Sequence, residues 1–175
     1  MIRVLSLGAG VQSTCVLLMS CEGVLPRLDA AVFADTQWEP RAVYKHLAWL
    51  EVEAKVNGIP ILRGTRGDLR ADAIDFRRTG GKASGNPGAK RHASMPLFVR
   101  NSDGTVGLIK RQCTSEYKIE VVSRIIRRDV LKLRPRQRSP KKIVEHWFGI
   151  SADEIDRTHR TEARWEVNHY PLITD

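Results

Sequence analysis

The chain has 175 residues, 42% of them hydrophobic and 28% charged, which suits one domain with a buried core and excludes wholesale disorder. Its 29 Lys and Arg against 20 Asp and Glu give a net charge of +9, which favours negatively charged partners. Three cysteines without a Cys-x-x-Cys pair argue against a disulfide framework, and the five histidines show no metal-ligand spacing. We expect no metal site, no membrane span and, by default, a cytoplasmic protein.

Short apolar runs alternate with helical patterns in the first part of the chain. Residues 2–7, 30–34 and 59–62 are predicted strands, and residues 11–21 and 40–56 are predicted helices. Pro40 suits the first position of the second helix, and Gly58 lies just beyond its end. This alternation predicts an α/β domain with a doubly wound, mainly parallel sheet covered by helices on both faces.

The pattern changes in the middle of the chain, where we predict an inserted loop and a β-hairpin over about residues 64–110. A short helix is expected over residues 69–78 and a basic, glycine-rich loop over residues 79–93. Residues 97–100 and 105–110 flank Asn101-Ser102-Asp103-Gly104, which is typical of a hairpin turn. Further helices are predicted over residues 115–133, from Pro140 to Gly149, and directly after Ser151. We interpret residues 1–175 as a single domain, with Trp49 and Trp147 in its core.

The strongest local motif is Gly8-Ala9-Gly10-Val11-Gln12-Ser13-Thr14, which lies between a predicted strand and a predicted helix. Small residues let the backbone approach a ligand closely, and the N–H groups at a helix start favour anions. No Gly-Lys-Ser/Thr ending follows, so the motif is not a Walker loop, and the third glycine of the dinucleotide fingerprint is missing. A tight strand–helix turn without a ligand is the alternative interpretation.

This motif resembles the pyrophosphate loop of the adenine-nucleotide alpha-hydrolase superfamily, whose usual form is Ser-Gly-Gly-x-Asp-Ser. The resemblance implies a Rossmann-like fold and phosphate contacts from the residues around this loop, namely Ser6, Gly8, Ala9, Gly10, Gln12, Ser13 and Thr14. Gln12 stands where the family has Asp, and an amide cannot hold Mg²⁺ as a carboxylate does.

Two more segments resemble the PAPS reductase-like (phosphoadenosine phosphosulfate reductase-like) members of that superfamily. The first is Ala34-Asp35-Thr36 with Glu39 after the second strand, which implies contacts to adenine and ribose. The second is Arg111-Gln112-Cys113-Thr114 with Lys118, which implies binding of the anionic end of the ligand and a reactive thiol. A strand-end turn and a buried, inert Cys113 are the alternatives that the residues leave open.

The fourth segment runs from Val144 through Trp147-Phe148-Gly149-Ile150-Ser151 to Asp153-Glu154 and Arg157. It is similar to a segment of PAPS reductase-like proteins borne by phages and mobile elements, whose relatives also occur beside CRISPR systems. The resemblance implies that Arg157 joins the anion site, although an amphipathic surface helix explains it nearly as well. True PAPS reductases carry a further Cys near the C-terminus, so a C-terminal portion is expected to be lacking here.

These segments imply ATP or PAPS as the ligand, and two functions stay open. An enzyme would adenylate a substrate by attack at the α-phosphorus of ATP with Mg²⁺, or act on a phosphosulfate, through Ser13, Asp35, Cys113 and Lys118. A non-catalytic accessory protein would bind the nucleotide and associate with nucleic acid or a ribonucleoprotein complex. Gln12 favours the accessory protein, whereas the set of Arg111, Cys113 and Lys118 favours the enzyme.

The charge is concentrated between Arg124 and Lys142, where nine basic residues accompany one acidic residue, Asp129. Such a stretch is suited to the phosphates of a nucleotide or of a nucleic acid. A solvated helix face with a linker is the equally weighted alternative.

Overall fold

The structure of the protein is a computed structural model that describes residues 1–74, 98–108, 114–158 and 161–174. The chain divides into two compact units. Unit 1 comprises Met1–Ala34, Glu39–Gly64 and Val122–Asp175, and unit 2 comprises Asp35–Trp38 and Thr65–Val121. Each unit is described by itself.

The first five elements follow the predicted alternation of strands and helices. They are β1 (Ile2–Ser6), α1 (Val11–Cys21), β2 (Ala30–Asp35), α2 (Arg41–Val56) and β3 (Ile61–Thr65). Pro40 is the residue that caps α2 and not its first helical residue, and Gly58 beyond the helix has a φ of 68°. The third strand lies two to three residues later than predicted, because the Ile59 N–H still donates to the Ala54 carbonyl in the turn that ends the helix.

The middle of the chain contains the predicted hairpin. Its elements are α3 (Leu69–Ile74), β4 (Phe98–Arg100) and β5 (Val106–Leu108), and β4 and β5 pair antiparallel. The predicted loop over residues 79–93 lies outside the described residues. A long helix follows in three segments, with π-helical turns at both ends: η1 (Thr114–Ile119), α4 (Glu120–Ile125) and η2 (Ile126–Val130).

The expected helix between Pro140 and Gly149 is wrong. That part of the chain forms β6 (Val144–Phe148), which pairs parallel to β1 with Ile2 beside Val144 and Ser6 beside Phe148. A 3₁₀ helix, η3 (Ala152–Thr158), follows Ser151, and β7 (Glu166–His169) and α5 (Pro171–Thr174) end the chain. This run is a strand because β1 on one side and β7 on the other pair with it, a long-range cause that its own residues do not show.

The main sheet has five strands in the order β3-β2-β1-β6-β7. The pairs β1–β2, β1–β6 and β6–β7 are parallel, which confirms an α/β fold with a mostly parallel sheet. The chain moves outward from β1 to β2 and β3 on one side, and returns to the other side of β1 as β6 and β7. The order therefore reverses at the junction of β1 and β6.

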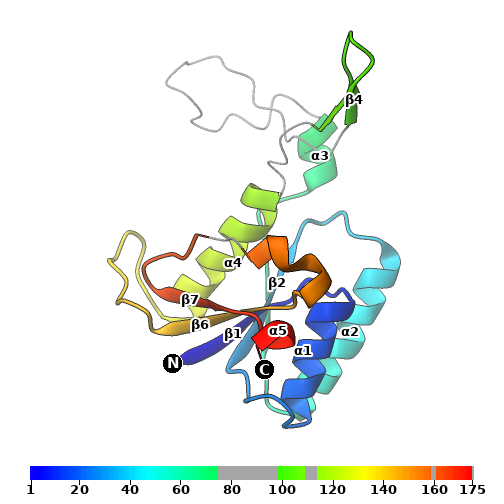
Figure 1. Ribbon diagram of the computed structural model, residues 1–175. Helices are drawn as coiled ribbons and strands as arrows, with labels where there is room; N and C mark the ends of the chain where they lie inside the picture. The colour runs from blue at the N-terminus through cyan, green and yellow to red at the C-terminus, as the bar shows by residue number, and fades with distance from the viewer. Residues whose placement is uncertain (75–97, 109–113, 159–160, 175) are drawn as a thin grey trace. The chain divides into compact units, whose positions relative to one another are not determined.

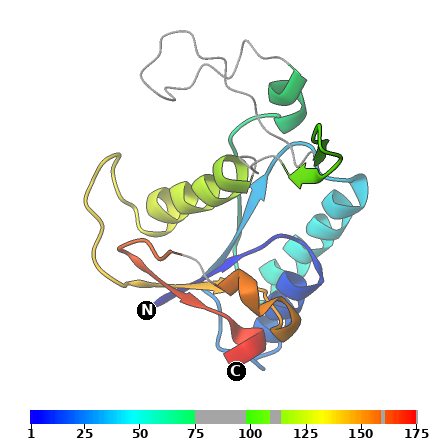
Figure 2. The ribbon, with the colours of Figure 1, turned by 45° about the horizontal axis from the view of Figure 1, so that its top comes forward.

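Side chains alternate between the two faces of the sheet. Leu5, Phe33 and Trp147 belong to one core cluster with buried residues of α1 and α2. Val4 and Val32 are buried outside that cluster, on the face toward the helix that carries Ile125 and Ile126. Figures 1 and 2 show α1 and α2 on one side of the sheet and α4 on the other. Helices on both faces therefore bury both sides of these strands.

Within the described ranges, every helix is too short or too polar to cross a membrane.

Candidate functional site

The glycine turn (residues 8–14) connects β1 to α1 and is closed by the side chain of one of its own residues, Ser13. The Ser13 hydroxyl donates to the Gly10 carbonyl at 3.2 Å and accepts from the Gly8 N–H at 3.2 Å. Ala9 adopts a left-handed φ of 53°, and Ser13 is buried. Ser13 thus holds the turn together, so its hydroxyl has a structural part in this site.

The first turn of α1 has no side-chain cap on its N–H groups. Gly10 occupies the N-cap position in an extended conformation and supplies no side-chain cap, and the turn contains no acidic residue. Val11 is 87% exposed, and nothing lies within 4 Å of a Cβ placed on Gly10. The positive end of the helix dipole is therefore uncapped and is open on the side of Gly10 and Val11.

The glycine turn lies where the strand order of the sheet reverses. It follows β1 at the carboxyl edge, and the neighbouring β6 ends at the same edge because the two strands are parallel. In open α/β sheets, ligands bind at this reversal point, outside the carboxyl ends of the strands. The position of the turn is thus a favourable one for a ligand.

The end of β6 packs directly on the start of α1. A Cβ on Gly149 would lie 2.5 Å from the Ser13 nitrogen and 2.7 Å from the Gln12 carbonyl carbon. Past this contact, the Gln12 side-chain Nε2 donates to Ser151 Oγ at 2.7 Å and to Glu154 Oε2 at 3.0 Å. The segment after β6 is thereby bonded to the glycine turn. We call this segment, residues 149–157, the wall beside the glycine turn.

Glu154 links Gln12 to Arg157. The Arg157 Nη1 donates to both carboxylate oxygens of Glu154, at 2.7 and 2.6 Å. Arg157 first, and Gln12 second, hold the pKa of Glu154 below its usual value of 4.5. Through Glu154, the predicted anion-binding residue Arg157 lies on the wall beside the glycine turn. Its side chain is 63% exposed.

Thr14 faces a second helix. Its hydroxyl lies 2.9 Å from Nε2 of His46 on α2, and the His46 ring stacks on Trp49 at a centroid distance of 5.5 Å. Trp49 is 44% exposed, so its expected place in the core is wrong, whereas Trp147 is fully buried as predicted. Trp49 faces outward because Leu47 and Leu50 already present the buried side of α2.

Asp35 and Thr36 belong to unit 2, where their side chains form turns. The Asp35 carboxylate accepts the Gln37 N–H at 2.7 Å, and the Thr36 hydroxyl accepts the Trp38 N–H at 3.3 Å. Thr36 is buried, and its carbonyl accepts the Leu69 N–H. Ala34 is a buried residue of β2 in unit 1, and Ser6 ends β1 beside Val32.

Lys118 lies on η1 in unit 2, and its side chain is exposed. The preceding Tyr117 is buried and donates to Asp72, while Arg66 lies 5.4 Å from the Tyr117 ring centroid and 3.0 Å from Glu116. Burial and the Asp72 carboxylate raise the pKa of Tyr117, so it stays a neutral hydroxyl. This cluster orients the helix that carries Lys118. Arg111 and Cys113 lie outside the described residues.

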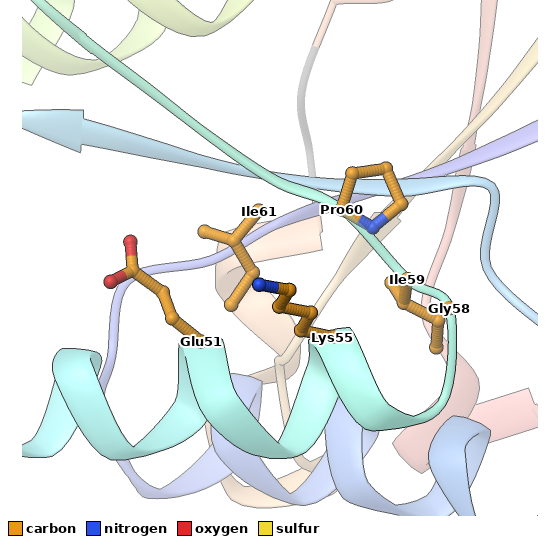
Figure 3. Close-up of a pocket in the computed structure, with 6 residues that line it drawn as sticks. All are labelled: Glu51, Lys55, Gly58, Ile59, Pro60 and Ile61. Atoms are coloured by element: carbon orange, nitrogen blue, oxygen red, sulfur yellow. The ribbon is translucent and has the colours of Figure 1, made fainter.

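A pocket of about 430 Å³ lies in unit 1, at the end of α2 and the start of β3 (Figure 3). It is lined by Glu51, Lys55, Gly58, Ile59, Pro60 and Ile61. Since β3 begins here, the pocket lies at the amino edge of the sheet, opposite the glycine turn. No predicted site residue lines it.

Three residues of the site were not assigned from the sequence: His46, Ser151 and Glu154. The Gly-Ile-Ser-x-Asp-Glu motif was the available signal for Ser151 and Glu154, but only the fold shows that they reach Gln12. In the described part of the chain, no group of three or more His, Cys, Asp or Glu side chains is placed to hold a metal ion.

The chain was compared with protein-family models, with curated proteins and with solved structures. No protein-family model, no curated protein and no solved structure matches the chain. The functional assignment therefore depends on the geometry of the site and on the motifs themselves.

Proposed function

We propose that the protein is an adenine-nucleotide-binding domain of the PAPS reductase-like type within the adenine-nucleotide alpha-hydrolase superfamily. The observation that carries this proposal is the uncapped, exposed N-terminus of α1 behind a glycine turn, at the point where the strand order reverses. A helix N-terminus in this position is suited to the phosphates of ATP or PAPS.

The backbone of Gly8, Ala9 and Gly10 would surround the phosphates, and Arg157 would approach them from the wall after β6. Ser13 would keep the turn in shape, since both of its hydrogen bonds stay within the turn. Further contacts come from the motifs as proposals: adenine and ribose at Ala34, Asp35 and Thr36, and the anionic end at Arg111 and Lys118.

In the enzymatic form of this proposal, an acceptor oxygen bonds to the α-phosphorus of ATP. The bond from that phosphorus to the bridging oxygen breaks, and pyrophosphate leaves with the electron pair. The residues beside the glycine turn do not fit a bound Mg²⁺: Gln12 has no carboxylate, and both Glu154 oxygens already accept hydrogen bonds from Arg157. No step is therefore assigned to a metal.

The position of the Gln12 side chain favours a second candidate, a nucleotide-binding accessory protein without turnover. The Gln12 amide is engaged with Ser151 and Glu154, which ties two segments together and supplies no charge for phosphate transfer. Such a protein would keep the nucleotide as a structural or sensory ligand while it contacts nucleic acid or a ribonucleoprotein complex.

Isothermal titration with ATP and with PAPS tests the nucleotide site, using two substitutions of the same residue, Gly10. Asp and Asn are equally good N-caps, and the space around Gly10 accommodates either, so G10D and G10N should both fold. Either side chain would cap N–H groups that the phosphates would use, but only G10D also places a negative charge against them. We therefore expect G10D to bind at least tenfold more weakly than G10N, a difference of about 1.4 kcal/mol. Wild type that binds neither nucleotide, or equal affinities of G10D and G10N, would refute the site.

Release of pyrophosphate from ATP with Mg²⁺ separates the two candidates. Turnover by wild type that falls further in G10D than in G10N supports the enzyme. Tight ATP binding without pyrophosphate release, across a panel of nucleophilic acceptors, supports the accessory protein.

A further inference from the structure

The basic loop (residues 131–143) joins η2 to β6 and lies at the amino edge of the sheet. Since β6 and β1 are parallel, this edge is opposite the carboxyl edge that holds the glycine turn. The strands are five residues long, so the two edges are roughly 17 Å apart. In Figures 1 and 2 the loop is the yellow segment that projects to the left of β6. The charge of the basic loop therefore lies at a different edge of the sheet from the proposed nucleotide site.

Hydrogen bonds hold the loop in a defined shape. Gln137 accepts the Arg134 N–H on its side chain at 2.9 Å and donates its own N–H to the Arg134 carbonyl at 3.1 Å. The Arg127 guanidinium donates to the Gln137 carbonyl at 2.7 Å, and Arg164, from the segment before β7, donates to the buried Ser139 at 3.2 Å. These contacts fix the loop at both ends and at its turn.

The backbone of the loop is strained at three cationic positions. Lys132, Arg136 and Lys142 have left-handed φ values of 52°, 63° and 45°, which side chains of this kind rarely adopt. Glycine adopts this conformation without strain and asparagine with less strain, yet all three positions carry cations.

The charge of the loop is concentrated and little compensated. Six basic residues of the loop are exposed: Lys132, Arg134, Arg136, Arg138, Lys141 and Lys142. The loop itself contains no acidic residue. Asp129 before it is paired with Arg128 at 2.7 Å, and Glu162 lies 3.9 Å from the Lys142 Nζ. The exposed Arg164 adds a further cation from the neighbouring segment.

We propose that the basic loop, with Arg164, is a sequence-independent binding surface for the phosphate backbone of double-stranded nucleic acid. Spaced arginines and lysines neutralise successive phosphates and release counterions. Single-strand binders add aromatic side chains on which bases stack, and the loop has no aromatic residue. A duplex, with its higher charge density, is thus the form of nucleic acid that this surface fits best.

Fluorescence anisotropy with a labelled duplex of about 20 base pairs tests this proposal. If about six phosphates are neutralised, the affinity should fall roughly a thousandfold between about 50 and 200 mM KCl. The variant R134E/R136E/R138E should bind at least a hundredfold more weakly at low salt. A matched variant on α2, R41E/K45E/K55E, has the same net charge and exposed sites, and should stay within about tenfold of wild type.

Several outcomes would overturn the proposal. These are no duplex binding by wild type at low salt, equal losses in the two triple variants, or tighter binding of an oligothymidine strand than of the duplex. Binding of vesicles with anionic lipid but not of the duplex would assign the surface to a membrane instead. Should R134E/R136E/R138E fail to fold, R134Q/R136Q/R138Q removes the charge without reversing it, and its affinity should be at least tenfold lower.

Discussion

The closest backbone approach in the site involves Gly149 and the first turn of α1. A Cβ on Gly149 would fall 2.6 Å from the Ser13 Cα, where only backbone atoms could give way. The glycine is thus required by contact rather than by its own conformation, and it lets the segment after β6 reach Gln12.

Gly149→Ala should therefore destabilise the fold by about 1–3 kcal/mol, as overpacking of a tight contact does. Gly10→Ala is the matched change, at the N-cap of α1, where an added methyl group meets open space. It should cost at most about 1 kcal/mol. Urea denaturation of the two variants measures both values, and equal losses would show that the contact at Gly149 is not tight.

The bonds from Arg157 and Gln12 to Glu154 give the site a pH dependence. They lower the pKa of Glu154 in the folded protein below 4.5, so their stabilisation is present above that pH and is lost as the pH falls through the lowered value. The destabilisation caused by Glu154→Gln should thus be greatest above about pH 5 and should shrink toward pH 3.

Denaturation midpoints of wild type and Glu154→Gln at several pH values between about 3 and 7 provide the measurement. In an Arg157→Ala background the largest cause of the shift is gone, and the pH dependence of the difference should weaken. A difference that stays constant with pH in both backgrounds would contradict the assigned role of Glu154.

At the scale of elements, β6 determines how the domain closes. It lies between β1 and β7 and is buried on both faces, with Trp147 in the cluster beneath α1 and α2. The indole nitrogen of Trp147 has no hydrogen-bond partner among the described atoms, so this side chain contributes through packing. Trp49, by contrast, lies on the outer side of α2 and packs on His46.

Trp147→Ala should cost about 3–5 kcal/mol, the range for loss of a large buried aromatic side chain. Trp49→Ala should cost less than about 1 kcal/mol, because the side chain is 44% exposed. Thermal unfolding followed by circular dichroism compares them. A loss at position 49 as large as that at position 147 would contradict the placement of the two tryptophans.

At the scale of the whole molecule, the parallel sheet separates the two proposed binding surfaces. The glycine turn lies at its carboxyl edge and the basic loop at its amino edge, within the same compact unit. No described side chain belongs to both surfaces. Each ligand should therefore respond to changes at its own edge alone.

This separation predicts a double dissociation, measured by titration with ATP and by duplex anisotropy on the same preparations. R134E/R136E/R138E should keep the ATP affinity of wild type within about threefold, or less than about 1 kcal/mol of coupling. G10D should keep the duplex affinity within the same limit. A variant that weakens both ligands would show that the two surfaces form one site.

The sequence by itself predicted the parts of the protein that depend on local chemistry. The strands and helices of the first half, the hairpin around Asn101 and Gly104, and the glycine turn all follow from residues that are neighbours in the chain. Charge counting likewise located the basic stretch. Of the residues proposed for the nucleotide site, those of the glycine turn lie together for this local reason.

Only the tertiary structure decided the rest. The five residues of β6 include only three apolar ones, Val144, Trp147 and Phe148, and such a short run is read as a helix or as a strand equally well. It is a strand because β1, far away in the chain, pairs with it. That pairing in turn brings Glu154, the partner of Arg157, to Gln12, and it places the basic loop at the opposite edge. Long-range strand pairing carries no local signal, which is why the sequence showed the two charged features but not that the sheet keeps them apart.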